Sequence, residues 1–431
     1  MRKKRLIWLK LDNAAKIYPA SRRKNWTNVF RLSATLKDEI DKAVVSSALK
    51  VTLERFPSFN VRLRKGLFWY YLQQLDKEPQ IKSEASYPLT WMSSGELRSC
   101  AFRVIVHDKR IAFEFFHSIT DGTGAMTFFK SFLAEYIEQK YGEKIENANG
   151  ILSRKENCSD EELEDSFLKH SGPVSADRRE RTAWKIRGTA EPTGFQHLTC
   201  FTVDTATVLE KAHVYNVTLT AFLTAAMMMA IQNLQLERVT EQKKRKPVRV
   251  LIPVDLRKLF GSKTLRNFAM YTTPEILPQL GYYSFEEICK CVRSRMELDI
   301  TPKIMCMKIA TNVSSERILA VRLMPLFIKN MVMKAVFNAV GECKSCLSLS
   351  NLGNIELPSN MAEHIERLDF ILGVQAAAPH NCGVLSFGGK LNINFIRNII
   401  EPDLEKHFFL VLRDMGIEAQ VQTNLSAKDG E

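Results

Sequence analysis

The chain has 431 residues, a length that usually divides into about two domains. Hydrophobic residues make up 45% of it and charged residues 25%, an ordinary composition for a globular protein with large buried cores. The net charge of +13 admits nucleic acid, an anionic membrane or an anionic small substrate as a partner. The basic runs lie far apart and no known nucleic-acid-binding pattern accompanies them, so we expect no nucleic-acid partner.

The cysteines and the apolar segments indicate the compartment. Nine cysteines, an odd number without regular spacing, favour a reducing environment. The pair Cys343 and Cys346 has no second pair or nearby histidines to complete a zinc site, so we expect no metal. The apolar run 6–9 is too short for a signal peptide, and the most apolar helix, 219–231, falls short of the roughly 18 residues of a membrane span. We therefore interpret the chain as cytoplasmic.

Hydrophobic periodicity predicts a mixed series of elements before residue 143. They are a strand at 26–32, a helix at 37–53, short strands at 61–63 and 68–73, and a hairpin of strands 101–106 and 111–116. A helix with aromatic residues at helical spacing follows from Phe128, and Gly142 is its predicted end.

Residues 143–190 are charged and poor in apolar side chains, which is typical of an interdomain crossing or a long surface loop. The mixed pattern then begins again. Helices are predicted at 205–215, 218–234, 285–298, 317–340 (interrupted at Pro325) and 402–412, and strands at 198–203, 248–253, 346–350, 368–374, 383–387 and 391–396. We therefore predict an α/β protein with mixed sheets and two domains, 1–190 and 191–431.

One short run carries candidate chemistry, His117-Ser118-Ile119-Thr120-Asp121-Gly122, between a strand and a helix. An imidazole at the end of a strand has the near-neutral pKa that a general base needs. Asp121 is placed to accept backbone hydrogen bonds and cap the helix, and Gly122 gives the backbone extra freedom. Taken alone, the same pattern is also typical of a surface turn or of a histidine satisfied near the core.

The run FFHSITDGTG resembles the HxxxDG motif of chloramphenicol acetyltransferase, plant-type acyltransferases, carrier-dependent condensation domains and alcohol acetyltransferases. Other segments resemble these proteins in the expected order. They are 9–20 (LKLDNAAKIYPA), 55–60 (RFPSFN, similar to RHxxLR), 218–226 (TLTAFLTAA), 252–257 with 265–268, and 349–353 (LSNLG). The chain is thus identified as a member of the HxxxDG acyltransferase superfamily, nearest to its condensation and alcohol-acetyltransferase-like branches.

The resemblance implies a fold of two chloramphenicol-acetyltransferase-like lobes in a V with a central tunnel. It implies that His117 deprotonates an acceptor alcohol or amine, with acyl-CoA as the thioester co-substrate and no permanently bound cofactor. It gives Asp121, Gly122 and Arg55 structural places at the site, with Arg55 as the partner of Asp121. Thr120, Ser350, Asn351 and Asn267 are candidate oxyanion or substrate contacts.

Departures from the family pattern leave alternatives open. Phe116 stands where condensation domains carry a first histidine, Asn60 replaces the second arginine of the early motif, and the DFGWG motif of the plant-type branch is absent. An acyl carrier protein acting in trans is an alternative donor. A binding protein that kept the fold and lost the chemistry is a second alternative. Asp255 and Arg257 form either a functional pair or only the end of a strand.

Overall fold

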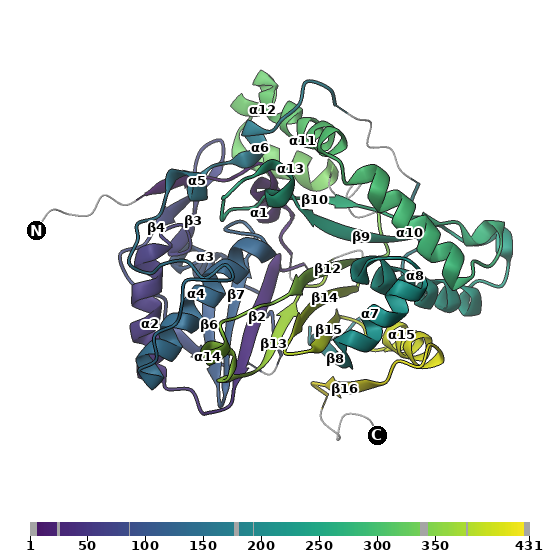
Figure 1. Ribbon diagram of the computed structural model, residues 1–431. Coiled ribbons are helices and arrows are strands. Elements are labelled where there is room, and N and C mark those ends of the chain that lie inside the picture. Colours follow the sequence, from purple (N-terminus) through teal and green to yellow (C-terminus); the bar gives the residue numbers. More distant parts are fainter. Residues whose placement is uncertain are drawn as a thin grey trace, which may run out of the picture.

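The computed structural model describes residues 7–23, 26–85, 87–175, 181–192, 194–336, 344–375 and 378–425. Cys343, the first residue of the apolar run 6–9 and the end of the helix predicted at 317–340 lie outside the described residues. The strands form three sheets, and helices surround them (Figure 1). The predicted α/β class with mixed sheets is confirmed.

The first large sheet belongs mainly to the first half of the chain. Its five strands run in the order β13 (Ile365–Ile371), β2 (Val29–Leu36), β7 (Arg110–Phe116), β6 (Phe102–His107) and β5 (Ile81–Ser83). Helices α2 (Lys42–Arg55) and α4 (Gly122–Tyr141) pack against each other beside it. The core between sheet and helices is aromatic, with Phe128 edge-on to Phe113 and Phe115. This packing fixes the end of β7 and the start of α4, where the histidine motif lies.

A small sheet and short helices complete this side of the molecule. The sheet has the order β1 (Trp8–Lys10), β4 (Tyr70–Gln74) and β3 (Val61–Lys65). The helical segments are η1 (Ala14–Lys16), α1 (Ile17–Ser21), α3 (Ser94–Ser99), α5 (Asp160–Leu163) and α6 (Ser166–Lys169). The last two are the helices of the charged stretch predicted as a crossing at 143–190, as far as the structure describes that stretch.

The second large sheet is built from the second half of the chain. It has the order β10 (Ala269–Thr272), β9 (Val248–Asp255), β12 (Leu347–Asn354), β14 (His380–Phe387), β15 (Lys390–Arg397), β8 (His197–Asp204) and β16 (Ala419–Thr423), with β11 (Glu275–Ile276) beside β9. Strand β12 is parallel to β9 and to β14, and the other pairings are antiparallel. The sheet is therefore mixed, as predicted.

Helices enclose the second sheet and extend beyond it. They are α7 (Thr205–Val214), α8 (Leu219–Arg238), η2 (Gln242–Lys244), α9 (Arg257–Phe260), η3 (Pro278–Leu280), α10 (Phe285–Asp299), α11 (Pro302–Arg317), α12 (Leu319–Leu323), α13 (Leu326–Val336) and α15 (Asp403–Asp414). The short helix α14 (Ser359–Ala362) packs instead on β13 of the first sheet. Helix α8 has 20 residues and is longer than the predicted apolar span, so by length and composition it could cross a membrane. Most of it is buried, and it packs against α10 and α15, which is how a core helix behaves.

One strand crosses between the two halves of the chain. Strand β13 comes from the second half, yet it pairs with β2 in the first large sheet and packs beside β14 in the second. At Gly383 of β14 a Cβ atom would overlap the carbonyl of Phe370 in β13, so glycine permits this close approach. The two sheets are therefore in direct contact, while the domain boundary at residue 190 stays a prediction.

Candidate active site

His117 lies where β7 has ended at Phe116 and before α4 begins at Gly122. Its backbone N–H donates to the Asn28 carbonyl at 2.8 Å, which fixes the chain at that point. The imidazole stacks on Tyr18 of α1, with ring centroids 4.5 Å apart, and the ring of Phe30 stands edge-on to it at 5.0 Å. Two aromatic rings from separate elements therefore determine the plane of the imidazole, which keeps part of its surface exposed.

A chain of three polar side chains determines which imidazole nitrogen carries the proton. The Oδ1 atom of Asn267 lies 3.0 Å from Nδ1 of His117, and the Nδ2 atom of Asn267 donates to Oδ2 of Asp12 at 3.2 Å. A carboxylate only accepts hydrogen bonds, so Asp12 turns the amide nitrogen of Asn267 toward itself and the oxygen toward His117. Nδ1 must then carry the hydrogen, and Nε2 has the lone pair.

Buried contacts fix the position of Asp12. It is fully buried, its Oδ1 accepts the backbone N–H of Ala15 at 2.7 Å, and the guanidinium of Arg266 is 3.7 Å from Oδ2. Burial raises the pKa of the Asp12 carboxyl, and the charge of Arg266 opposes that shift. The charge of Arg266 thus favours the ionised carboxylate that orients Asn267.

The surroundings of His117 keep the imidazole neutral. Desolvation by the packed rings lowers the pKa of His117, because the charged form loses water. Its own backbone carbonyl, the charge of Asp121 and the bond to Asn267 act in the opposite direction without reversing the shift. A neutral imidazole with Nε2 unprotonated is the form that accepts a proton.

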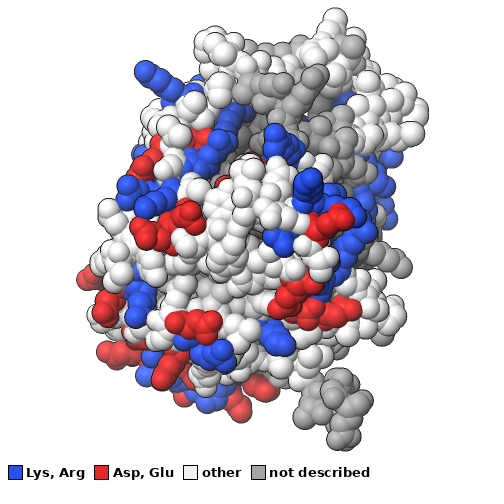
Figure 2. Space-filling model, turned by 90° about the vertical axis from the view of Figure 1, so that its right-hand side faces the viewer, with Lys and Arg blue, Asp and Glu red and all other residues white. Residues whose placement is uncertain are grey.

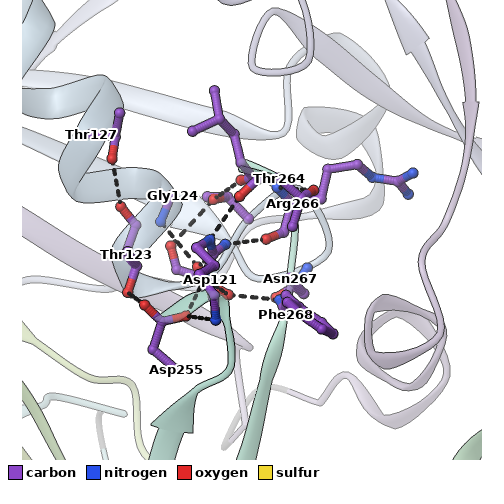
Figure 3. Close-up of polar contacts among 12 residues, drawn as sticks. Asp121, Thr123, Gly124, Thr127, Asp255, Thr264, Arg266, Asn267 and Phe268 are labelled. Carbon is purple, nitrogen blue, oxygen red and sulfur yellow. Dashed lines mark hydrogen bonds and ion pairs between the residues drawn. The ribbon is translucent and has the colours of Figure 1, made fainter. Parts of the chain in front are cut away.

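Asp121 ties the motif to the loop that carries Asn267. It caps α4 by accepting the Gly124 N–H at 3.0 Å (Figure 3). Arg257 binds both of its carboxylate oxygens at 2.9 and 3.0 Å. Its Oδ2 also accepts the backbone N–H of Phe268 at 2.8 Å, next to Asn267. The carboxylate therefore joins the turn after β7 to the turn between β9 and β10.

The prediction that Asp121 forms an ion pair with Arg55 is wrong. Arg55 of α2 instead binds the carboxylate of Glu162 through two nitrogens at 2.7 and 2.9 Å, and its Nε donates to the Ser153 carbonyl. It therefore attaches the charged crossing segment to α2. Arg257 binds Asp255 as well as Asp121. The pair of Asp255 and Arg257 considered in the sequence is therefore formed, and its arginine is also the partner of Asp121 in the histidine motif.

The other predicted site residues have different partners. The Thr120 hydroxyl is buried and donates to the Leu265 carbonyl at 2.7 Å, so it supports the Asn267 loop. Ser350 and Asn351 lie on β12, and the Asn351 amide donates to the Thr220 hydroxyl at 3.1 Å. A Cβ atom on Gly122 would lie 2.8 Å from the Leu352 side chain, so β12 reaches the motif at this glycine.

Asp12 and Tyr18 are the site residues that the sequence analysis did not single out. Both fall within 9–20, a segment chosen only for its family resemblance. Their contacts with the site join residues more than 90 positions apart, which local periodicity does not reveal. Among the residues that the structure describes, no group of three or more histidines, cysteines or carboxylates is arranged to hold a metal ion.

Comparisons with known proteins identify the fold. No family model and no curated protein matches the chain. TRI101 of F. graminearum, solved with coenzyme A and deoxynivalenol, superposes with a TM-score of 0.65 at 10% identity, over 96% of this chain and 99% of that one. Polyketide synthase associated protein 5 from Mycobacterium tuberculosis gives 0.61 at 15%, over 93% and 96%, and the first condensation domain of the CDA synthetase 0.59 at 12%, over 94% and 95%. The predicted fold, shared by these acyltransferase and condensation structures, is confirmed over nearly the whole chain.

Proposed function

We propose that this protein is an acyltransferase that moves an acyl group from a thioester donor, acyl-CoA, to a hydroxyl or amine acceptor, with His117 as the general base. The observation that carries the proposal is the hydrogen bond from Nδ1 of His117 to Asn267. It leaves Nε2 as the proton acceptor of a neutral, desolvated imidazole.

The proposed reaction needs one proton shuttle. Nε2 of His117 takes the proton of the acceptor while the acceptor oxygen or nitrogen attacks the thioester carbon. The carbon–sulfur bond of the resulting tetrahedral intermediate then breaks, and the leaving thiolate receives the proton from Nε2. The imidazolium formed in between keeps its Nδ1–H bond to Asn267, whose orientation is set by Asp12. No covalent acyl-enzyme is required.

The names of the structural neighbours support a coenzyme A donor and a hydroxyl acceptor. TRI101 was solved with coenzyme A, and the TRI3 structure from Fusarium sporotrichioides, with a TM-score of 0.60 at 12% identity, is a trichothecene 15-O-acetyltransferase. The net charge of +13 suits the phosphates of coenzyme A. The condensation domain among the neighbours supports the alternative in which an acyl carrier protein presents the thioester.

The oxyanion of the intermediate needs a hydrogen-bond donor. Ser350 and Asn351 stay proposed contacts because they lie on β12, the strand that reaches the motif at Gly122. We propose that donor and acceptor meet at His117 in a tunnel between the two lobes. A cytoplasmic location agrees with the cysteines in the described part of the chain, all of which are free thiols.

Thiol release tests the proposal. Free thiol from acetyl-CoA and longer acyl-CoAs is followed with a panel of alcohols and amines, comparing wild type with His117→Ala. His107→Ala is the matched control, because His107 is an exposed histidine at the end of β6, next to the turn of the β6–β7 hairpin. We expect acceptor-dependent release from wild type and His107→Ala, and its loss in a folded His117→Ala. Equal release by all three proteins would contradict the role of His117. Release only from acyl carrier protein thioesters would establish the alternative donor.

A further inference from the structure

The helices α12 and α13 turn their apolar side chains to solvent. In the stretch 318–332, seven large apolar side chains are exposed: Ile318, Leu319, Leu323, Phe327, Ile328, Met331 and Val332. Phe327 and Met331, one turn apart on α13, are 63% and 70% exposed. On the neighbouring loop Leu67 is 73% exposed, and Trp8 of β1 is 61% exposed. Apolar residues gathered in this way mark an interaction surface, whereas scattered ones do not.

The opposite face of α13 buries a lysine together with Leu326, whereas the buried face of an ordinary surface helix is apolar. Lys329 is 1% exposed, and its ammonium donates to the Phe68 carbonyl at 2.9 Å and lies 3.4 Å from the centre of the Trp69 ring. The amide of Asn330 donates to the Tyr70 hydroxyl at 3.1 Å. These bonds anchor α13 with Lys329 and Asn330 inward, so the apolar side faces outward because of specific contacts.

The charge around this surface is positive. Residues 302–336 contain six lysines and arginines and a single acidic residue, Glu316. Two of the six do not add to the surface charge, because Lys329 is buried and Lys308 is paired with Asp299. Glu316 is paired with Lys16, so its charge is already neutralised. Arg322 and Lys334 are exposed beside the apolar residues, and Lys65 is exposed next to the Leu67 loop. The described atoms at the top of the molecule, where α12 and α13 stand in Figure 1, are mostly uncharged in Figure 2.

We propose that α12, α13 and the Leu67 loop form a docking surface for an anionic lipid bilayer. An exposed apolar helix face with Lys and Arg around it fits the boundary between acyl chains and anionic headgroups. A second protein would have to carry acidic side chains at the positions that face these lysines and arginines. The headgroups of an anionic membrane supply negative charge over the whole surface. The surface also adjoins the proposed active site, because α13 packs on α1, which carries Tyr18 against the His117 ring.

Vesicle flotation tests the docking surface. The full chain is mixed with vesicles of equal parts phosphatidylcholine and phosphatidylglycerol, or of phosphatidylcholine alone. The test variant is Phe327→Ser with Met331→Ser, and the matched control is Val214→Ser, since Val214 of α7 is 73% exposed and lies outside the surface. We expect wild type and control to float with the anionic vesicles. The partition coefficient of the double variant onto these vesicles should be lower by about tenfold or more. Arg322→Gln with Lys334→Gln should weaken binding only to the anionic vesicles.

Several outcomes would overturn the docking surface. They are no flotation of wild type at low salt, equal flotation of the Phe327/Met331 variant, or a concentration-dependent dimer that this variant abolishes, which would assign the surface to a second copy. Vesicle binding does not depend on the proposed chemistry. His117→Ala should float like wild type, and the Phe327/Met331 variant should keep thiol release with a water-soluble acceptor, so the two proposals fail separately.

Discussion

Asn267 accepts the Nδ1 hydrogen of His117 at 3.0 Å while its own amide nitrogen donates to Asp12 at 3.2 Å. The orientation of one amide group thus links a buried carboxylate near the start of the chain to the imidazole of the motif. Because the amide has one donor end and one acceptor end, reversing it would place a donor against Nδ1 and shift the hydrogen to Nε2. The first predictions concern this linkage.

Replacing Asn267 with leucine should impair catalysis without unfolding the protein. Loss of a hydrogen bond to a group that becomes charged costs about 1.5–3 kcal/mol, or about 10- to 100-fold in kcat. Asn267→Asp keeps an acceptor for the Nδ1 hydrogen, but its second oxygen lies against the Asp12 carboxylate, so the two buried carboxyl groups must share a proton. With that proton bound, the variant should retain more activity than Asn267→Leu. Steady-state kinetics of both variants check this, and equal activity of Asn267→Leu and wild type would refute it.

Asp12→Asn should lower the pKa of His117 further. The charge of Asp12 favours the imidazolium, so its removal favours the neutral ring. The substitution keeps the shape of the side chain, but its single carbonyl oxygen can accept from Asn267 or from the Ala15 N–H and not from both, so kcat should fall as well. Titration of the His117 imidazole by NMR measures the shift. A pKa that does not move would show that Asp12 is electrostatically remote from the ring.

Asp121 and Arg257 should be coupled in stability, whereas Asp121 and Arg55 should not. Arg257→Met leaves a buried carboxylate unpaired and should cost about 3–5 kcal/mol of unfolding free energy. Two double-mutant cycles test the assignment by chemical denaturation. Asp121→Asn should be strongly non-additive with Arg257→Met and additive with Arg55→Met, since Arg55 binds Glu162. The reverse pattern would restore the pairing expected from the family motif.

Gly124→Ala should destabilise the protein, because its Cβ would overlap the Leu265 carbonyl and the Thr120 hydroxyl. Forcing a methyl group into such a contact costs about 1–3 kcal/mol, and it would push the Asn267 loop away from the motif. Gly95→Ala in helix α3 is the control, since the new Cβ atom would lie at an ordinary 3.6 Å from the Ser93 hydroxyl and alanine favours a helix. Thermal unfolding should separate the two variants, and equal melting temperatures would show that the loop yields to the methyl group.

Local periodicity predicted much of the fold from sequence. The β6–β7 hairpin and helix α4 are confirmed, and α4 ends at Gly142 with φ +74° as the glycine suggested. Helix α11 was missed because its apolar residues do not gather on one side. The interruption predicted at Pro325 within 317–340 is confirmed, since α12 ends before this proline and α13 begins after it. Strand β1 was missed because it has three residues, too few to show a period.

The contacts of the site were harder to predict than its motif. His117 and Asp121 are recognisable because their spacing is local, but the partner of Asp121 is 136 residues away. The arginine expected from the family motif, Arg55, occupies a different contact, and Arg257 was considered only as a partner of Asp255. Nothing in the residues around Asp12 indicates its role, because the sequence alone does not distinguish a buried aspartate from an exposed aspartate.

The most direct test of the account is the pH dependence of kcat/KM for one substrate at a saturating concentration of the other, because its acid limb reports the essential base before the varied substrate binds. Burial lowers the pKa of His117, so the neutral, active form should persist below the ordinary value of 6.5 and be lost only at lower pH. We predict an acid limb below 6.5 in wild type that moves to lower pH in Asp12→Asn. A limb at or above 6.5, or one unchanged in Asp12→Asn, would contradict a desolvated His117 oriented through Asn267 as the base.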